Sequence, residues 1–161
     1  MTGPVLAALL AQAAPLAACI LILIGLRSRP GAAAATAIAA LTVSLVATAF
    51  LVWQVALPNV TDLVEATWLP VQGSAGLAFG IMFDPLATTM AFIVAAVTLA
   101  VMVYSLGYMR GDPGFARYYG FLALFGWAML GLVLASNLLQ LLVFWELVGL
   151  ASFLLIGFWF E

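Results

Sequence analysis

Residues 137–160 read NLLQLLVFWELVGLASFLLIGFWF, a continuous apolar run that contains a single ionisable residue, Glu146. About 20 apolar residues are enough for a helix to cross the hydrocarbon core of a bilayer. At a rise of about 1.5 Å per residue, Glu146 would lie roughly 13 Å from the start of such a helix. The run therefore predicts a transmembrane helix with one carboxyl group close to the middle of the membrane.

A carboxyl group at that depth is costly, by about 2.5–3.5 kcal/mol for a charged side chain on insertion scales. The low dielectric of lipid favours the neutral acid over the carboxylate. Acidic side chains inside membranes often lie on ion or proton pathways, so we interpret Glu146 as a proton-transfer residue. The alternative is that a protonated Glu146 only holds helices together through a hydrogen bond to a neighbour.

The composition of the whole chain supports a membrane protein. Hydrophobic residues make up 68% of the 161 residues and charged residues 6%, and the mean hydropathy is +1.30. No water-soluble surface can be built from such a sequence, so the expected fold class is an all-α integral membrane protein with about five transmembrane helices. The net charge of −2 and the absence of Lys argue against a nucleic-acid partner.

The residue types that bind metals and redox groups are almost missing. The chain has no His and one Cys, Cys19, which lies inside an apolar run. These residues offer no ligand set for zinc, haem or an iron–sulfur cluster and exclude a disulfide within the chain. We therefore expect no metal and no cofactor to be bound by this chain.

We expect a single membrane domain over residues 1–161. Turn residues divide its apolar runs into separate helices. The first run has no basic residue before it and is longer than the apolar part of a signal peptide, so we interpret it as a retained helix. Asp84-Pro85 predicts the start of the third helix, as a capping acid followed by proline at the first helical position. The expected helices are 4–26, 32–55, 84–108, 115–135 and 137–160.

An outer loop, residues 58–82, separates the second and third helices. It holds two short apolar runs, 66–71 and 77–83, on either side of the sequence QGSAG. Two apolar runs around a glycine-containing turn are typical of a β-hairpin. We therefore expect a short hairpin in this loop.

The basic residues predict the orientation of the helices. Arg27 and Arg29 follow the first expected helix, and Arg110 and Arg117 follow the third, whereas the loop 58–82 has acids and no base. With alternating helices, both basic segments fall on one face of the membrane. The positive-inside rule then puts the N-terminus outside and the C-terminus in the cytoplasm, and we expect the protein in a bacterial inner membrane.

Several segments resemble a known family. Residues 144–150, FWELVGL, and 152–158, SFLLIGF, are similar to the antiporter-like subunits of proton-pumping NADH:quinone oxidoreductase, respiratory complex I. The most similar member is the largest, called subunit L in bacteria and subunit 5 in mitochondria. The sequences FDPL at 83–86, YMR at 108–110 and RYY at 117–119 also resemble it, so the likeness covers about residues 79 to 161.

The resemblance implies a proton-translocating membrane subunit that carries no redox group itself. Glu146 would take the role of the protonatable residue of a half-channel. NADH, flavin, iron–sulfur clusters and quinone would be bound by partner subunits, and this chain would contact the lipid bilayer and other membrane subunits. The family pairs this Glu with a Lys on a later helix. Because the sequence has no Lys and stops before the later helices of the family, we interpret it as an N-terminal portion of a longer subunit, or as a truncated gene product, and we do not expect it to pump protons alone.

Two other classes of function stay open. One is a subunit of a cation/proton antiporter, or of a bicarbonate-uptake membrane complex, that shares the same module. The other is a small structural membrane protein in which Glu146 only connects helices. The sequence leaves the transported ion, H⁺ or Na⁺, and the type of quinone undetermined.

Overall fold

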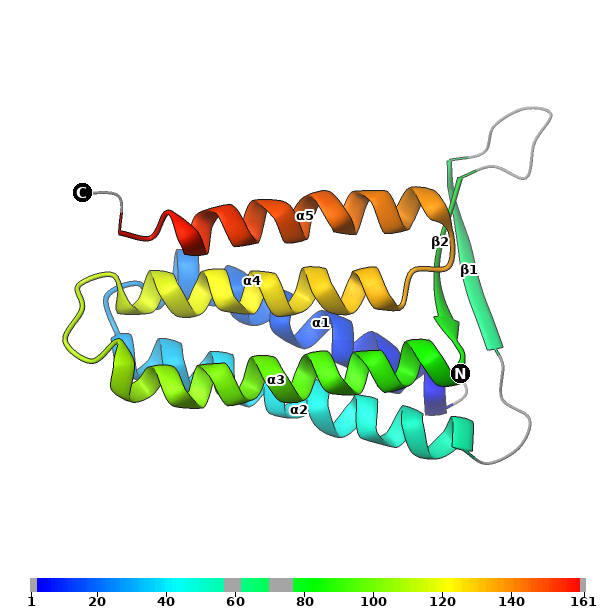
Figure 1. The fold of residues 1–161 in the computed structure, drawn as a ribbon, viewed down its shortest axis with the longest axis horizontal. Coiled ribbons are helices and arrows are strands. Elements are labelled where there is room, and N and C mark those ends of the chain that lie inside the picture. The colour runs from blue at the N-terminus through cyan, green and yellow to red at the C-terminus, as the bar shows by residue number, and fades with distance from the viewer. Residues whose placement is uncertain (1–2, 57–61, 70–76, 160–161) are drawn as a thin grey trace.

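The protein forms a bundle of helices with a β-hairpin at one end, as shown by a computed structural model that describes residues 3–56, 62–69 and 77–159 (Figure 1). The long axes of the helices run roughly parallel to one another. In chain order the elements are α1 (Gly3–Ile24), α2 (Pro30–Ala56), β1 (Asp62–Leu69), β2 (Leu77–Phe83), α3 (Pro85–Tyr108), α4 (Phe115–Val133) and α5 (Leu138–Ile156).

Five helices of the described chain are long and apolar enough to cross a membrane. The two shortest, α4 and α5, have 19 residues each. At about 1.5 Å per residue, 19 residues span about 28 Å, close to the thickness of about 30 Å of a hydrocarbon core. The predicted all-α membrane fold with five spanning helices is confirmed.

The helices form two layers. α3, α4 and α5 lie side by side in one layer, and α1 and α2 lie behind them (Figure 1). α1 packs against both α2 and α4, and α2 packs against α3, so these four helices make the centre of the bundle. α5 packs mainly against α4 and lies at the edge of its layer.

Small residues allow α1 and α2 to approach closely. Ser44 and Thr48 of α2 are fully buried, and the Ser44 hydroxyl donates a hydrogen bond of 2.9 Å to the carbonyl of Ala11 on α1. Small side chains and interhelical hydrogen bonds are the usual means of helix association in membranes, where lipid gives no hydrophobic driving force. The main core cluster includes these buried residues: Ala18, Cys19, Ile22, Ala33, Ala37, Leu41, Met102, Tyr119 and Ala123.

Local signals set the helix ends. The Asp84 side chain accepts a hydrogen bond from the amide of Ala87, and Pro85 is the first residue of α3, as predicted. α5 ends at Ile156 rather than at residue 160, because Gly157 caps it and its amide bonds to the carbonyl of Phe153. α4 ends at Val133 rather than at residue 135.

The hairpin pairs β1 and β2 in antiparallel register, with Asp62 opposite Phe83 and Glu65 opposite Gly80. The predicted hairpin is confirmed, and its second arm has the predicted bounds. Its first arm begins at Asp62, before the apolar run at 66–71 from which it was predicted. Residues 57–61 and 70–76 of the expected outer loop lie outside the described residues.

The two ends of the bundle differ in charge. The α1–α2 turn, which carries Arg27 and Arg29, lies at the same end as the α3–α4 turn, which carries Arg110 (Figure 1). Arg117 lies in the first turn of α4 at this end. The N-terminus and the hairpin lie at the opposite end. The alternation of the helices therefore brings every basic residue to one end.

Candidate functional site

The start of α5, the helix that carries Glu146, is attached to the hairpin. The Gln140 side chain donates to the carbonyl of Gly80 at 2.8 Å and accepts from the amide of Gly80 at 2.9 Å. The Asn137 side chain caps α5 by accepting from the amide of Gln140, and it donates to the carbonyl of Ala78. These bonds satisfy backbone groups of β2 that face the helix. They fix the position of α5 along its own axis.

Phe144 anchors the middle of α5 against α4. Its side chain is buried and its ring lies against the backbone of Gly131, where there is no room for a further carbon atom. Its centroid is 5.4 Å from that of Trp127 and 6.0 Å from that of Phe79. Gln140, Phe144 and Ala151 are the buried residues of α5, and they share one face of the helix. This face fixes the rotation of α5.

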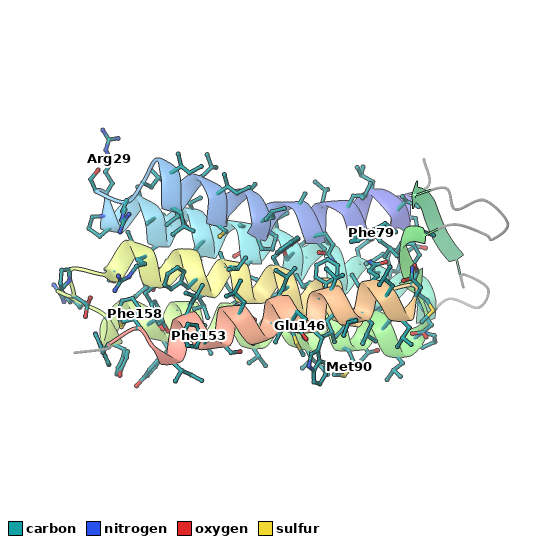
Figure 2. The ribbon with its side chains drawn as sticks, turned by 90° about the horizontal axis from the view of Figure 1, so that it is seen from above. Arg29, Phe79, Met90, Glu146, Phe153 and Phe158 are labelled. Carbon is teal, nitrogen blue, oxygen red and sulfur yellow. The ribbon has the colours of Figure 1, made fainter. Side chains whose placement is uncertain are left out.

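Glu146 lies on the opposite face, near the middle of α5 (Figure 2). Two residues after Phe144, the helix has turned by about 200°, so the Glu146 side chain points away from α4. It is accordingly exposed on the surface of this chain. The carboxyl group lies at mid-helix, as the sequence predicted, but the helices of this chain do not enclose it.

The surface around Glu146 is apolar. Leu142, Trp145 and Phe153 expose 53%, 63% and 72% of their area, and a Cβ added at Gly149 would meet no atom of the described residues within 4 Å. One face of α5 therefore presents large apolar side chains, one carboxyl group and an open position one turn after it. We call the residues Leu142, Trp145, Glu146, Gly149 and Phe153 the outer face of α5.

No positive charge of this chain lies at the level of Glu146. The sequence has no Lys and no His. Its four Arg residues lie at one end of the bundle, in two turns and in the first turn of α4. In the part of the chain that the structure describes, no three His, Cys, Asp or Glu residues are grouped so that they could hold a metal ion.

Gln140 and Asn137 were not recognised as important in the sequence. The signal was present, since a Gln in an otherwise apolar spanning segment needs a partner for its amide. Gln12 on α1 is a similar case: its side-chain oxygen is buried and has no hydrogen-bond partner in the described chain. Gln12 and Gln140 both line a hollow of about 430 Å³ between α1, α4, α5 and β2.

A known protein family matches part of the chain. Residues 68–119 match the family described as NADH-Ubiquinone oxidoreductase (complex I), chain 5 N-terminus. The matched segment covers part of the hairpin, α3 and the start of α4, and it ends before Glu146.

Curated relatives are similar over more than half of the chain. NAD(P)H-quinone oxidoreductase chain 5 of Synechocystis sp. is 52% identical over 89 residues, which is 55% of this chain and 13% of the relative. The chloroplastic subunit 5 of Anthoceros angustus is 50% identical over 94 residues, 58% of this chain and 13% of the relative. The chain thus matches about 13% of the length of these relatives.

Solved structures share the fold of nearly the whole chain. A chain in the structure of the Mrp complex from Dietzia sp. has a TM-score of 0.72 and 29% identity, over 96% of this chain and 16% of that one. A chain of the membrane-bound sulfane sulfur reductase, an archaeal respiratory membrane complex, has a TM-score of 0.76 over 92% of this chain and 29% of that one. At 17% identity, this second likeness concerns the fold alone.

The five apolar helices and these relatives establish an integral membrane protein. The comparisons also confirm the resemblance found in the sequence. Residues 68–119 match the N-terminal segment of chain 5 of NADH-ubiquinone oxidoreductase, and the chain is about 50% identical to NAD(P)H-quinone oxidoreductase chain 5 over 55–58% of its own length.

Proposed function

We propose that this chain is part of a proton-translocating subunit of an NAD(P)H-quinone oxidoreductase and that Glu146 transfers the proton. The observation that carries the proposal is a lone carboxyl group in the middle of α5, on an apolar face that the chain itself leaves uncovered. A carboxyl group at that depth is costly, and such groups are retained mainly on ion or proton pathways. The named relatives support the choice of complex.

The chemistry of Glu146 follows from its surroundings. Apolar neighbours favour the neutral acid, and an approaching positive charge favours the carboxylate. A cation that moves toward and away from Glu146 would therefore make it release and take up a proton. The cation must come from residues outside this chain, because its four Arg residues lie at one end of the bundle.

The energy for transport must also come from elsewhere. Moving one proton against 100 mV requires about 2.3 kcal/mol. We propose that partner subunits supply this energy. In this proposal, partner subunits hold NADH, flavin, iron–sulfur clusters and quinone, and this chain is a non-redox element of the translocase. It would not pump protons without these partners.

The basic end of the bundle supports an orientation. All four Arg residues lie at the end opposite the N-terminus and the hairpin. Under the positive-inside rule, that end faces the cytoplasm, and the N-terminus lies outside. A bacterial inner membrane is the location that we propose.

The test is the substitution Glu146→Gln in the complete assembly. Gln has nearly the same shape but cannot release a proton. We expect NADH-driven proton pumping to fall at least tenfold relative to electron transfer, while the subunit content of the purified complex stays the same. The matched control is Glu146→Asp, which keeps an acid on the helix and should retain measurable pumping. Unchanged pumping in Glu146→Gln would remove the proton-transfer role, and loss of assembly would favour a structural one.

A second candidate is a subunit of a cation/proton antiporter. It is favoured by the likeness to a chain of the Mrp complex, which covers 96% of this chain at 29% identity. Pumping by the assembly in sodium-free medium separates the two functions. Proton movement that needs NADH oxidation and no Na⁺ supports the oxidoreductase, whereas proton movement driven by an imposed Na⁺ gradient alone supports the antiporter.

A further inference from the structure

Two arginines from distant parts of the sequence line one hollow at the basic end of the bundle. Arg27 follows α1, and Arg117 lies in the first turn of α4. α1 and α4 pack together, which brings the two side chains to the same hollow of about 230 Å³. Its other lining residues are Pro113, Gly114 and Ala116. The hollow is thus open to a small group with negative charge.

Arg117 is held in place by the segment after α5. Its guanidinium carbon lies 4.9 Å from the centroid of the Phe158 ring, and Nη2 donates a long hydrogen bond of 3.5 Å to the carbonyl of Phe158. The Nε atom is buried and has no hydrogen-bond partner within the described residues. A buried donor without a partner is costly, so Arg117 keeps an unsatisfied donor in addition to its two contacts with Phe158.

The backbone of α4 adds further donors at the same place. Gly114 caps α4 without a side chain, so the amides of Ala116 and Arg117 donate no hydrogen bond to a capping side chain. The first amides of a helix carry partial positive charge and favour anions. They reinforce the two guanidinium groups.

One acidic side chain, Asp112, lies beside the hollow, and its carboxylate already accepts hydrogen bonds from other groups. Asp112 accepts from the amide of Gly114 at 2.6 Å and from the indole nitrogen of Trp159 at 3.0 Å. Each of its carboxylate oxygens therefore has a donor. Asp112 is the one acidic side chain that the structure describes at this end, where four Arg residues lie. The hollow keeps an excess of positive charge.

A row of exposed aromatic side chains marks the depth of this end in the membrane. Tyr104, Tyr108 and Trp159 expose 72%, 58% and 63% of their area. Their ring centroids follow one another at 6.2 and 6.1 Å. Exposed Tyr and Trp rings gather at the level of the lipid headgroups, where one side of the ring is apolar and the other is hydrated. The anion that is abundant at this level is the phosphate of a lipid.

We propose that the hollow between Arg27 and Arg117 binds the phosphate group of an anionic lipid headgroup. The arginines donate to the phosphate oxygens, because a guanidinium matches a phosphate with two parallel N–H groups. The bound lipid connects the α1–α2 turn to the start of α4. The site depends on the membrane location of the chain and not on the role of Glu146.

The test measures lipid binding to the full chain, purified in detergent and stripped of lipid. Three probes are titrated separately and detected by native mass spectrometry: dioleoylphosphatidylglycerol, dioleoylphosphatidylcholine and inorganic phosphate. Each guanidinium that donates directly to the phosphate should contribute about fivefold in affinity through charge-assisted hydrogen bonds, which a basic residue outside the hollow does not make. We therefore expect the double substitution R27Q/R117Q to weaken phosphatidylglycerol binding by about 25-fold. The matched control, R29Q/R110Q, removes the same charge from the same end and should change binding less than twofold.

Three outcomes would overturn the proposal. An equal loss in R29Q/R110Q would indicate general attraction by the basic end and no site. Binding of inorganic phosphate as tight as that of phosphatidylglycerol would indicate a site for a free anion. Unchanged binding in R27Q alone would exclude a site formed by Arg27 and Arg117. Arg27 is exposed, so its substitution should not disturb folding. R27Q therefore decides the test if R117Q does not fold. Fivefold weaker binding in R27Q, with its circular dichroism unchanged, supports the site.

Discussion

At the scale of single residues, α5 has two faces with different roles. Phe144 and Gly131 form a close contact between α5 and α4, with the Phe144 ring packed directly against the glycine. Glu146 and Gly149 lie on the outer face of α5, where both are exposed and a Cβ added at Gly149 would meet no atom of the described residues within 4 Å. Substitutions on the two faces should therefore have different consequences for stability.

The substitution Gly131→Ala should destabilise the bundle. The new methyl group would overlap the Phe144 ring, which is confined by Trp127 and Phe79. Overpacking of this kind costs about 1–3 kcal/mol. The measurement is the unfolding midpoint in a titration with denaturing detergent.

Gly149→Ala is the matched control for this prediction. The added methyl group meets no atom of the described residues within 4 Å, and Ala favours a helix over Gly by about 1 kcal/mol. Its unfolding midpoint should be unchanged or higher. Equal midpoints for the two variants would contradict the described packing of Phe144.

At the scale of elements, the hairpin determines where α5 starts. The Gln140 side chain bonds to both backbone groups of Gly80, and the amide of Met82 donates to the carbonyl of Leu134 at 3.1 Å. β2 is therefore connected to the α4–α5 turn as well as to its partner strand. This connection sets the level of Glu146 along the bundle.

Gln140→Leu should loosen this connection. The substitution keeps the side-chain volume but leaves the buried amide and carbonyl of Gly80 without their partner, at a cost of about 1–3 kcal/mol. We expect faster hydrogen exchange at the Gly80 amide, measured by mass spectrometry in detergent. The control is Leu141→Ala, the next residue, which is exposed and should leave the exchange at Gly80 unchanged. If the Gly80 amide exchanged as slowly in Gln140→Leu as in the unchanged protein, the pairing of β1 with β2 alone would be sufficient to protect it.

At the scale of the whole molecule, the two ends of the bundle lie on opposite sides of the membrane. Ser28 lies in the α1–α2 turn at the basic end, and Gly3 begins α1 at the hairpin end. Both residues are exposed. They provide positions at which the proposed orientation can be measured.

Single cysteines report this orientation in a Cys19→Ala background. Gly3→Cys should react with a membrane-impermeant maleimide added to intact cells, because the positive-inside rule puts this end outside. Ser28→Cys should react only after the cells are permeabilised. The reversed pattern would contradict the proposed orientation while leaving the fold unchanged.

The sequence alone was sufficient to predict the fold class and much of the topology. Apolar runs of about 20 residues predict spanning helices, because the hydrocarbon core has a fixed thickness. Asp84-Pro85 marks the start of α3 through local capping, which needs no tertiary contact. The spacing of the four Arg residues along the chain brings them to one end once the helices alternate.

Only the tertiary structure decides which way each helix faces. α5 is apolar almost all around, so its sequence does not distinguish the face of Phe144 from the face of Glu146. That choice depends on Gly131 of α4, which accepts the Phe144 ring, and on Gly80 of β2, which pairs with Gln140. The meeting of Arg27 with Arg117 likewise depends on the packing of α1 against α4. Such contacts join residues far apart in sequence, and no local pattern specifies them.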